Sequence, residues 1–150
     1  MQKLNLPAYD FNIKQEDGRK TIYDPFRKKH VLLTPEEWVR QSFARYLTEE
    51  KGYPASLMMT EFTLHLNKMV KRCDLVVHKP AGTPVVLIEC KAPGISIKGD
   101  TFDQVSRYNL VFRVKYLFVT NGLQHFGCRI DFNSRSVEFL RDIPVYGDLD

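Results

Sequence analysis

Two acidic residues in apolar surroundings are the first side chains in this sequence that could do chemistry. Asp74 precedes the apolar run Leu75–Val77, and Glu89 ends the apolar run Val85–Ile88. An ionised carboxylate in such surroundings is costly unless a cation or a counter-charge compensates it. Lys91 lies two residues beyond Glu89, so in a strand both side chains point to the same face. These residues could bind a metal ion and place an ammonium group beside it.

The two acidic residues are predicted to face each other on a β-hairpin. Strand-like runs at Arg72–His78 and Val85–Glu89 flank Lys79–Pro84, which is rich in turn-forming residues. If the turn is centred on the middle of that segment, residues whose numbers sum to 163 pair, as Asp74 and Glu89 do. Their Cβ atoms then lie about 5 Å apart. A bulge would shift this register by one residue.

Two carboxylates so close together repel each other unless a cation lies between them. A site with few hard oxygen ligands and room for waters suits Mg²⁺, with Mn²⁺ as its usual substitute. Lys91 could then orient a water or stabilise the charge on a phosphate. The competing interpretation is a surface salt bridge between Glu89 and Lys91, which leaves Asp74 unexplained.

A well-delimited helix is predicted ahead of the hairpin. Thr34 can cap it, Pro35 takes its first position, and Glu37 stands three residues after the cap, as in a capping box. The segment Lys51–Pro54 ends it with a Gly and a Pro. Residues at helical spacing give it one apolar face, formed by Val39, Phe43, Tyr46 and Leu47.

The remaining pattern predicts an α/β fold with a mixed central sheet flanked by helices. Asp100 can cap a second helix that runs to about Arg113. The order strand, helix, strand across residues 85–120 favours a crossover helix between two parallel strands. Besides the hairpin, strands are predicted at Glu61–Leu66, Tyr116–Thr120, His125–Phe132 and Ser136–Leu140.

The bulk properties fit one domain, with a core at about 34–132 and residues 1–33 as an N-terminal extension. A formal net charge of +4 permits an acidic partner such as nucleic acid without demanding one. The three cysteines lack zinc-finger spacing and indicate buried thiols in a reducing compartment. Because no signal-peptide pattern and no apolar run of about 20 residues is present, we expect a cytoplasmic protein with no membrane partner.

The acidic pair and its lysine resemble the core of the PD-(D/E)xK nuclease superfamily. Cys73-Asp74, a gap of fourteen residues and Glu89-Cys90-Lys91 look like its D…ExK pattern, with Cys73 where the superfamily name has Pro. The segment Gln104–Tyr108 is similar to the QxxxY motif of the RecB-like branch. Its Gln and Tyr are about one helical turn apart and therefore project the same way.

A longer stretch, from about Thr34 to Gly127, resembles the N-terminal nuclease domain of type I restriction enzyme R subunits. The segments Pro35–Gln41, Ile88–Pro93 and Val119–Gly122 carry this resemblance. It implies a restriction-endonuclease-like core with the element order α-β-β-β-α-β.

The resemblance also implies roles for individual residues. The metal would be held by Asp74, Glu89 and the main-chain carbonyl of Cys90, while Lys91 assists attack on the phosphate. The glutamine and tyrosine of the QxxxY segment would organise the site or contact a DNA phosphate. The residues implied as catalytic are Asp74, Glu89, Lys91, Gln104 and Tyr108.

Related branches add a glutamate of the first helix to the metal site, and two residues compete for that role. Glu37 already has a structural function in the capping box. Glu36 falls near the centre of the apolar face, whereas Glu37 is expected to point well away from it. The sequence therefore favours Glu36 as the additional metal ligand.

The implied activity is Mg²⁺-dependent hydrolysis of DNA phosphodiester bonds by an endonuclease of restriction or DNA processing. The alternative is a catalytically silent nuclease-fold module that binds DNA or a restriction-modification subunit, and RNA stays open as a substrate. A homodimer also stays open, since nucleases that cut both strands often dimerise.

Lys68, Lys71 and Arg72 could line a DNA path or form a solvated turn. The four histidines have no ligand-like spacing and are expected to be packed or solvated.

Overall fold

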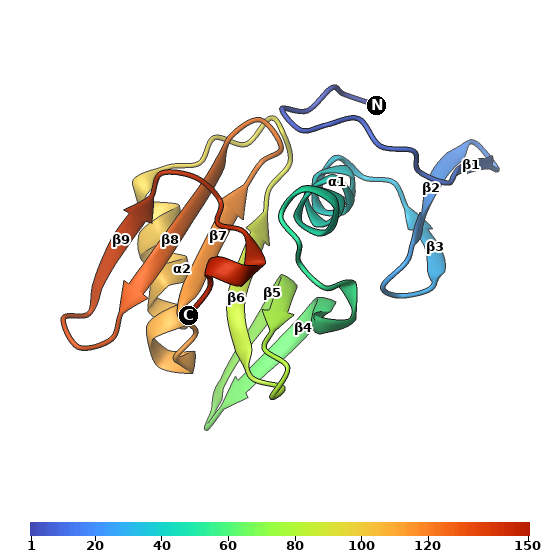
Figure 1. Ribbon diagram of the computed structural model, residues 1–150. Coiled ribbons are helices and arrows are strands. Elements are labelled where there is room, and N and C mark those ends of the chain that lie inside the picture. Colours follow the sequence, from blue (N-terminus) through green and yellow to red (C-terminus); the bar gives the residue numbers. More distant parts are fainter.

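The computed structural model describes residues 1–150 and contains two β-sheets with a helix between them (Figure 1). The predicted core order α-β-β-β-α-β is confirmed. No helix is long and apolar enough to cross a membrane. The helices are α1 (Pro35–Glu50) and α2 (Gly99–Phe112), with single 3₁₀ turns at η1 (Ala55–Leu57) and η2 (Tyr146–Asp148). The strands are β1 (Ile13–Glu16), β2 (Arg19–Asp24), β3 (Lys29–Leu32), β4 (Met58–Leu66), β5 (Met69–His78), β6 (Pro84–Cys90), β7 (Tyr116–Thr120), β8 (His125–Asp131) and β9 (Ser136–Leu140).

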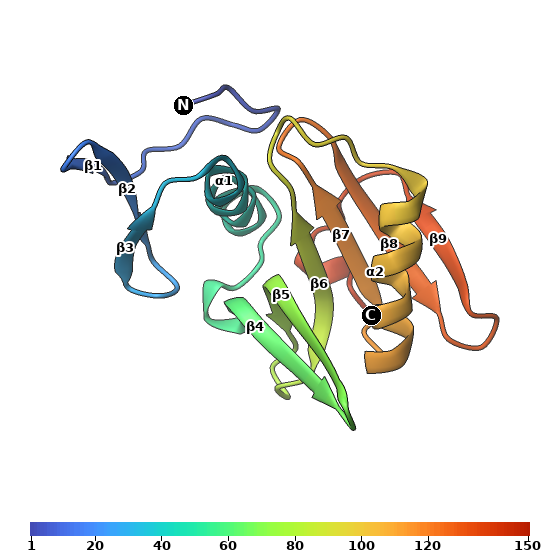
Figure 2. The same cartoon turned by 180° about the vertical axis from the view of Figure 1, so that it is seen from behind.

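The large sheet has six strands in the order β4-β5-β6-β7-β8-β9. Strands β6 and β7 are parallel and joined by α2, as predicted, and every other neighbouring pair is antiparallel. The two helices cover opposite faces of this sheet (Figures 1 and 2). Alternation along β7 shows the same division, because Phe118 packs in the cluster that includes α1 while Leu117 and Val119 pack with Phe102 of α2.

The register predicted for the β5–β6 hairpin is confirmed over its paired residues. Leu75 pairs with Ile88, Val76 with Leu87 and Val77 with Val86, each summing to 163. The pairing register shifts between Val77 and His78, where the irregular turn begins. The regular pairing stops at Leu75–Ile88, one residue short of Asp74 and Glu89.

Helix α1 begins and ends where its capping residues predict. The Thr34 hydroxyl oxygen accepts a hydrogen bond from the main-chain N–H of Glu37 at 3.0 Å. After the last turn the chain leaves the helix through Gly52, whose φ of +72° favours glycine. Val39, Phe43 and Leu47 are fully buried, so the predicted apolar face packs on the large sheet.

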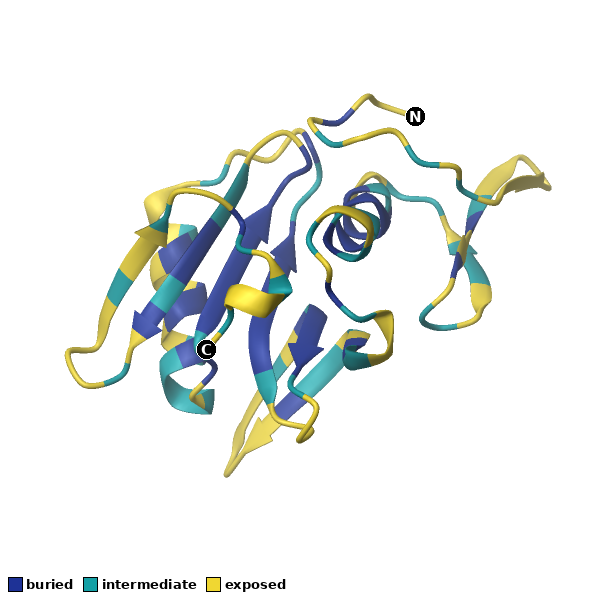
Figure 3. Cartoon of the chain, viewed as in Figure 1, coloured by how far each residue is buried: buried dark blue, intermediate teal, exposed yellow.

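A three-stranded antiparallel sheet of β1, β2 and β3 lies on the other side of α1, and no strand was predicted there (Figure 1). The turn at Asp17-Gly18, between β1 and β2, has the positive φ angles of a tight hairpin turn, +50° and +76°. The strands lack a sequence signal because few of their side chains are buried, as Figure 3 shows. Only Ile22 and Asp24 are buried in this sheet.

The prediction that Asp100 caps the second helix is wrong by two residues. Helix α2 starts at Gly99 with Lys98 in the capping position. Asp100 lies inside the first turn, where one of its carboxylate oxygens accepts a hydrogen bond from the N–H of Thr101 at 3.0 Å. Its negative charge still suits the N-terminal end of a helix.

The C-terminal end of α2 is fastened to β7 by the fully buried side chain of Asn109. Its amide nitrogen donates to the carbonyl oxygens of Val114 and Tyr116 at 3.0 and 2.9 Å. Just before Val114, the chain leaves the helix through Arg113, whose φ is +56°. The amide thus satisfies two main-chain acceptors at the point where the crossover enters the sheet.

Replacing Asn109 by Ala should lower the free energy of unfolding by about 2–3 kcal/mol, because both carbonyls lose their donor. Denaturant unfolding measures this change. Asn133→Ala, at an exposed asparagine in the β8–β9 turn, serves as the control and should change stability by less than about 0.5 kcal/mol. A similar loss in both variants would contradict this role of Asn109.

His125 connects the N-terminal segment to the large sheet through a directed chain of hydrogen bonds. The N–H of Gly122 donates to Thr120 Oγ1 at 2.9 Å, which lies 2.7 Å from His125 Nδ1. The other ring nitrogen lies 2.9 Å from the carbonyl oxygen of Asn5 and must donate to it. This leaves Nδ1 as the acceptor of the threonine hydroxyl proton, so the pattern is that of a neutral imidazole stacked on Phe43.

Burial lowers the pKa of His125 from its ordinary value of 6.5. The unfolded chain therefore binds a proton more readily than the folded one, and His125 contributes stability that is lost as the pH falls below 6.5. The stability of the wild type relative to His125→Gln should decrease between pH 7.5 and pH 5 in denaturant unfolding. A pH-independent difference would show that this imidazole does not titrate differently in the two states.

Candidate metal centre

The predicted acidic residues lie where β5 and β6 stop pairing. Beyond the Leu75–Ile88 pair, the main-chain N–H of Cys90 donates to the carboxylate of Asp74 at 2.8 Å. A side chain thus takes over the hydrogen bond that the neighbouring strand no longer supplies. This contact fixes Asp74 beside the Glu89–Cys90 segment and confirms that the two acidic positions adjoin.

Glu89 is a buried carboxylate with one direct cationic partner. Its side chain is 10% exposed, and Oε1 lies 2.8 Å from the ammonium nitrogen of Lys71. Burial raises the pKa of Glu89 above its ordinary value, and the nearby charge of Asp74 raises it further. Lys71 and, more weakly, Lys91 oppose this rise. The site therefore stabilises a positive charge at this carboxylate.

Cys90 and Lys91 continue β6 past the acidic pair. Burial raises the pKa of the Cys90 thiol well above its ordinary value, and the charge of Asp74 adds to the rise. The thiol stays protonated, so this residue offers a metal only its main-chain carbonyl. The N–H of Lys91 donates to the carbonyl of Thr120 at 2.8 Å, which anchors its main chain to β7 while its side chain is half-buried.

The tyrosine of the QxxxY segment reaches the acidic pair through Lys71. The Lys71 ammonium lies 5.0 Å from the centre of the Tyr108 ring, within the range of a cation–π contact. Tyr108 is half-buried on α2, and Gln104 lies exposed one turn earlier on the same helix. The structure thus connects Tyr108 with Glu89, whereas Gln104 faces solvent.

The structure corrects what the sequence predicted about Glu36 and Glu37. Glu37 is buried, with 6% of its surface exposed, and is bonded to Arg27 at 2.7 Å and to Arg40. Glu36 is exposed. Glu36 was expected on the apolar face of the helix and Glu37 away from it, but the turn after β2 brings Arg27 to the side of α1 that carries Glu37 and buries that residue. A carboxylate between two guanidinium groups is neutralised, which leaves Glu36 as the one without such partners.

A hollow of about 630 Å³ lies between the start of α1, β3 and the middle of β4 and β5. Asp74, Glu36 and Glu37 all line it, but Glu89 and Lys91 do not. No three His, Cys, Asp or Glu side chains converge closely enough to hold a metal ion by themselves. The structure therefore places Asp74 and Glu36 on the same hollow, while Glu89, which precedes the hydrogen-bond partner of Asp74 along the chain, lies outside that hollow.

The donor set still suits a magnesium ion. Mg²⁺ is usually held by one or two carboxylates and keeps several waters or substrate phosphate oxygens as its other ligands. Asp74, Glu89 and the Cys90 carbonyl supply two carboxylates and one further oxygen at the end of two adjacent strands. These are hard oxygen donors, and the only nearby thiols are protonated.

Lys71 is the functional candidate whose role the sequence left open, between a DNA path and a solvated turn. Its ammonium is directed at Glu89 instead. The signal that points to it is the unbalanced charge of the acidic pair, since two adjacent carboxylates require a cation. Lys71 precedes Asp74 by three residues on β5 and is the nearest lysine on that side.

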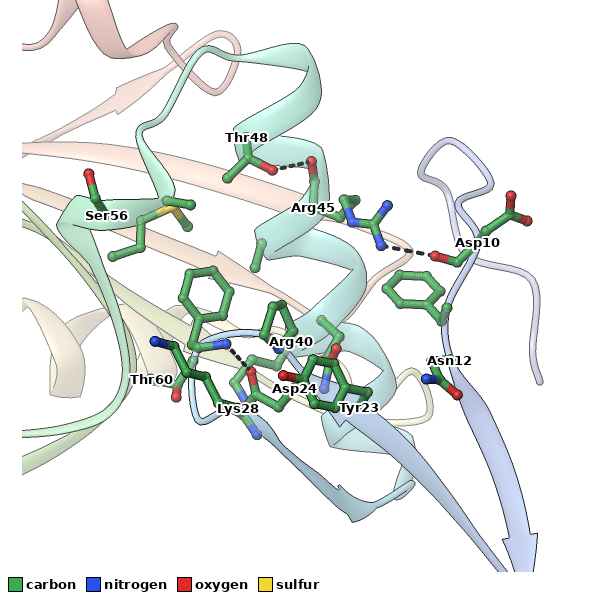
Figure 4. A pocket seen from close by; sticks show the side chains of 17 residues that line it. Asp10, Asn12, Tyr23, Asp24, Lys28, Arg40, Arg45, Thr48, Ser56 and Thr60 are labelled. Carbon is green, nitrogen blue, oxygen red and sulfur yellow. Dashed lines mark hydrogen bonds and ion pairs between the residues drawn. The ribbon is translucent and has the colours of Figure 1, made fainter.

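A second cavity, of about 580 Å³, lies between α1 and the N-terminal segment (Figure 4). At one side of it, the Arg45 guanidinium donates a hydrogen bond to the main-chain carbonyl oxygen of Asp10 at 2.9 Å. Asp24 and Arg40 lie at another side. Arg40 lines both this cavity and the hollow beside Asp74. None of the predicted catalytic residues lines it, so the candidate chemistry belongs to the end of β5 and β6.

The hydrogen bond between Asp74 and the Cys90 N–H can be tested separately from any catalysis. Asp74→Asn and Asp74→Ala both remove the negative charge, but only Asn keeps an oxygen that can accept this bond. In metal-free protein, Asp74→Ala should therefore be about 1–3 kcal/mol less stable than Asp74→Asn in denaturant unfolding. Equal stabilities would mean that the Cys90 N–H does not depend on this side chain.

Comparison with known proteins identifies the family and the fold of this chain. Residues 35–144 match the family model described as the N terminus of the type I restriction enzyme R protein. No curated protein matches with significant similarity. Among solved structures, a fragment from Vibrio vulnificus YJ016, described as an HsdR subunit of a type I restriction enzyme, is similar with a TM-score of 0.55 and 18% identity. The match covers 78% of this chain and 24% of that one, and it shows a shared fold.

This structural likeness agrees with the restriction-endonuclease-like core expected from the sequence. Because the family model covers well over half of its residues, the chain belongs to the family of type I restriction enzyme R protein N-terminal domains.

Proposed function

We propose that this domain is a Mg²⁺-dependent nuclease that hydrolyses phosphodiester bonds in DNA. The observation that carries the proposal is that Asp74 accepts a hydrogen bond from the Cys90 N–H where β5 and β6 stop pairing, next to Glu89 and its partner Lys71. Two neighbouring carboxylates with ammonium groups nearby can bind a cation and a phosphate together. A surface salt bridge alone does not explain the half-buried contact of Asp74.

Each residue has a distinct task in this proposal. Asp74, Glu89 and the Cys90 carbonyl would hold Mg²⁺, which when bound polarises the phosphate and eases departure of the 3′ oxygen. The ammonium of Lys91 orients the attacking water and stabilises the added charge on the phosphate. Gln104, which is exposed on α2, and the half-buried Tyr108 one turn later contact the phosphate backbone near the scissile bond. Glu36 lines the adjoining hollow and could reach the metal through a water.

The surroundings of the site favour a polyanionic substrate. The β4–β5 hairpin projects beyond the rest of the large sheet (Figure 2) and carries the exposed cations Lys68 and Arg72. The net charge of the chain is +4. Lysine and arginine at such positions neutralise backbone phosphates without selecting a sequence.

A restriction-modification assembly is the proposed setting. The family model describes the N terminus of a larger R protein. The structural relative is also far longer than this chain, and the match covers 24% of it. The partners proposed for this domain are therefore DNA and other restriction-modification subunits. A homodimer would place two such sites on opposite strands of a duplex.

Mutation of the three core residues tests the proposal. Cleavage of plasmid and single-stranded DNA with Mn²⁺ or Mg²⁺ should fall at least about 100-fold in Asp74→Ala, Glu89→Ala and Lys91→Ala, because each removes a charge needed in the transition state. Gel analysis of the products measures the loss and distinguishes endonuclease from exonuclease action. RNA of the same sequence tests the alternative substrate.

Glu138→Ala, at an exposed position of β9 far from the site in the sheet order, is the matched control and should cleave normally. Cleavage that persists in all three core variants, or that does not depend on a divalent metal, would refute the assignment.

A catalytically silent DNA-binding module is the second candidate, and one observation favours it. Glu89 already has a cation at 2.8 Å, so the acidic pair is balanced without a metal. DNA binding that survives EDTA, in a protein that never cleaves, would select this function.

A further inference from the structure

The Lys71 side chain occupies the position of a counter-ion in the candidate metal centre. Its ammonium is 2.8 Å from Glu89 Oε1, and the two side chains are only 19% and 10% exposed. The ammonium of Lys71 therefore compensates the buried carboxylate of Glu89, which is one of the proposed metal ligands.

This ammonium is held from its other side by an aromatic ring. The centre of the Tyr108 ring, on the crossover helix α2, lies 5.0 Å from the Lys71 nitrogen. The ring offers a site of negative electrostatic potential without offering a hydrogen-bond acceptor. Lys71 can therefore turn between Glu89 and the ring at small cost, because both positions stabilise its charge.

We propose that Lys71 is a built-in counter-ion that a divalent metal displaces from Glu89, and that Tyr108 receives the displaced ammonium. This inference rests on the proposed function, since it concerns the same site. Lys71 is then a positioning residue, which holds the Glu89 carboxylate in place before the metal binds. After displacement, its ammonium remains within the site and can face the phosphate of the substrate.

The proposal has a thermodynamic consequence that separates it from a merely structural salt bridge. If lysine and metal compete for the same carboxylate, removal of the lysine destabilises the metal-free protein and at the same time strengthens metal binding. A structural salt bridge predicts the opposite for the second quantity, because a distorted site binds metal more weakly.

The experiment compares Mn²⁺ binding to wild type and Lys71→Met by isothermal titration calorimetry in the absence of DNA. The dissociation constant should fall about tenfold in Lys71→Met, the size expected when one partly buried charge no longer competes. The melting temperature of the metal-free variant should be lower than that of wild type, and its increase on addition of Mn²⁺ should be larger. Lys71→Arg keeps the positive charge and should restore wild-type affinity.

Lys14→Met is the control, because this lysine is exposed on β1 of the small sheet and does not reach Glu89. It should leave the Mn²⁺ dissociation constant unchanged. If Lys71→Met does not fold, Lys71→Gln supplies the same comparison with a smaller loss of polar contact.

Two outcomes overturn different claims. Equal or weaker Mn²⁺ binding by both neutral Lys71 variants, with clear binding by wild type, refutes the counter-ion proposal and leaves the nuclease assignment intact. Absence of Mn²⁺ binding by wild type and by all Lys71 variants refutes the metal site itself.

Discussion

The arrangement of this domain depends on how the charge of a buried carboxylate, that of Glu89, is compensated inside a β-sheet. Moving a charge away from water is unfavourable, and two like charges on adjacent strands make it more so. The structure meets this constraint at the point where β5 leaves β6, since one unpaired main-chain N–H is available there for Asp74. Lys71 supplies the charge that Glu89 needs. Where the strands separate, a main-chain N–H thus becomes free to bind one carboxylate, and the other carboxylate requires a cation.

The crossover from β6 to β7 determines what else can approach this point. Because the two strands are parallel, their carboxyl ends lie at one edge, and Lys91 is anchored to Thr120 of the neighbouring strand. The hydroxyl of Thr120 also belongs to the hydrogen-bond chain that ends at Asn5. The same residue therefore links the main chain of the candidate catalytic lysine to the histidine and to the N-terminal segment.

Much of the fold follows from local pattern. The spacing of Val39, Phe43 and Leu47 identifies α1, and the apolar run of β7 identifies a central strand, because burial on one or both faces leaves a period in the sequence. Hairpin symmetry gives the β5–β6 register from turn position alone. Strands β1 to β3 leave no such period, since their side chains are mostly exposed.

The candidate site is predictable in its residues and less so in its contacts. The D…ExK pattern and the tyrosine of the QxxxY pattern select side chains that the fold brings near the point where β5 and β6 stop pairing, whereas Gln104 faces solvent. The partners of Glu37 and Glu89 are long side chains from other elements, Arg27 and Lys71. A sequence gives no distance for such pairs, because a flexible lysine or arginine reaches several carboxylates equally well until the backbone is placed.

The position of Arg27 has a consequence for where this domain begins as a folding unit. The segment that matches the family starts at residue 35, yet the buried carboxylate of Glu37 depends on a guanidinium that lies before that boundary. Arg27 also contacts Asp24 and Glu61, so it joins three elements of the structure. The segment defined by homology therefore starts later than the ion pairs of the first helix do. Glu37 has both of its guanidinium partners only when residues upstream of the helix are present.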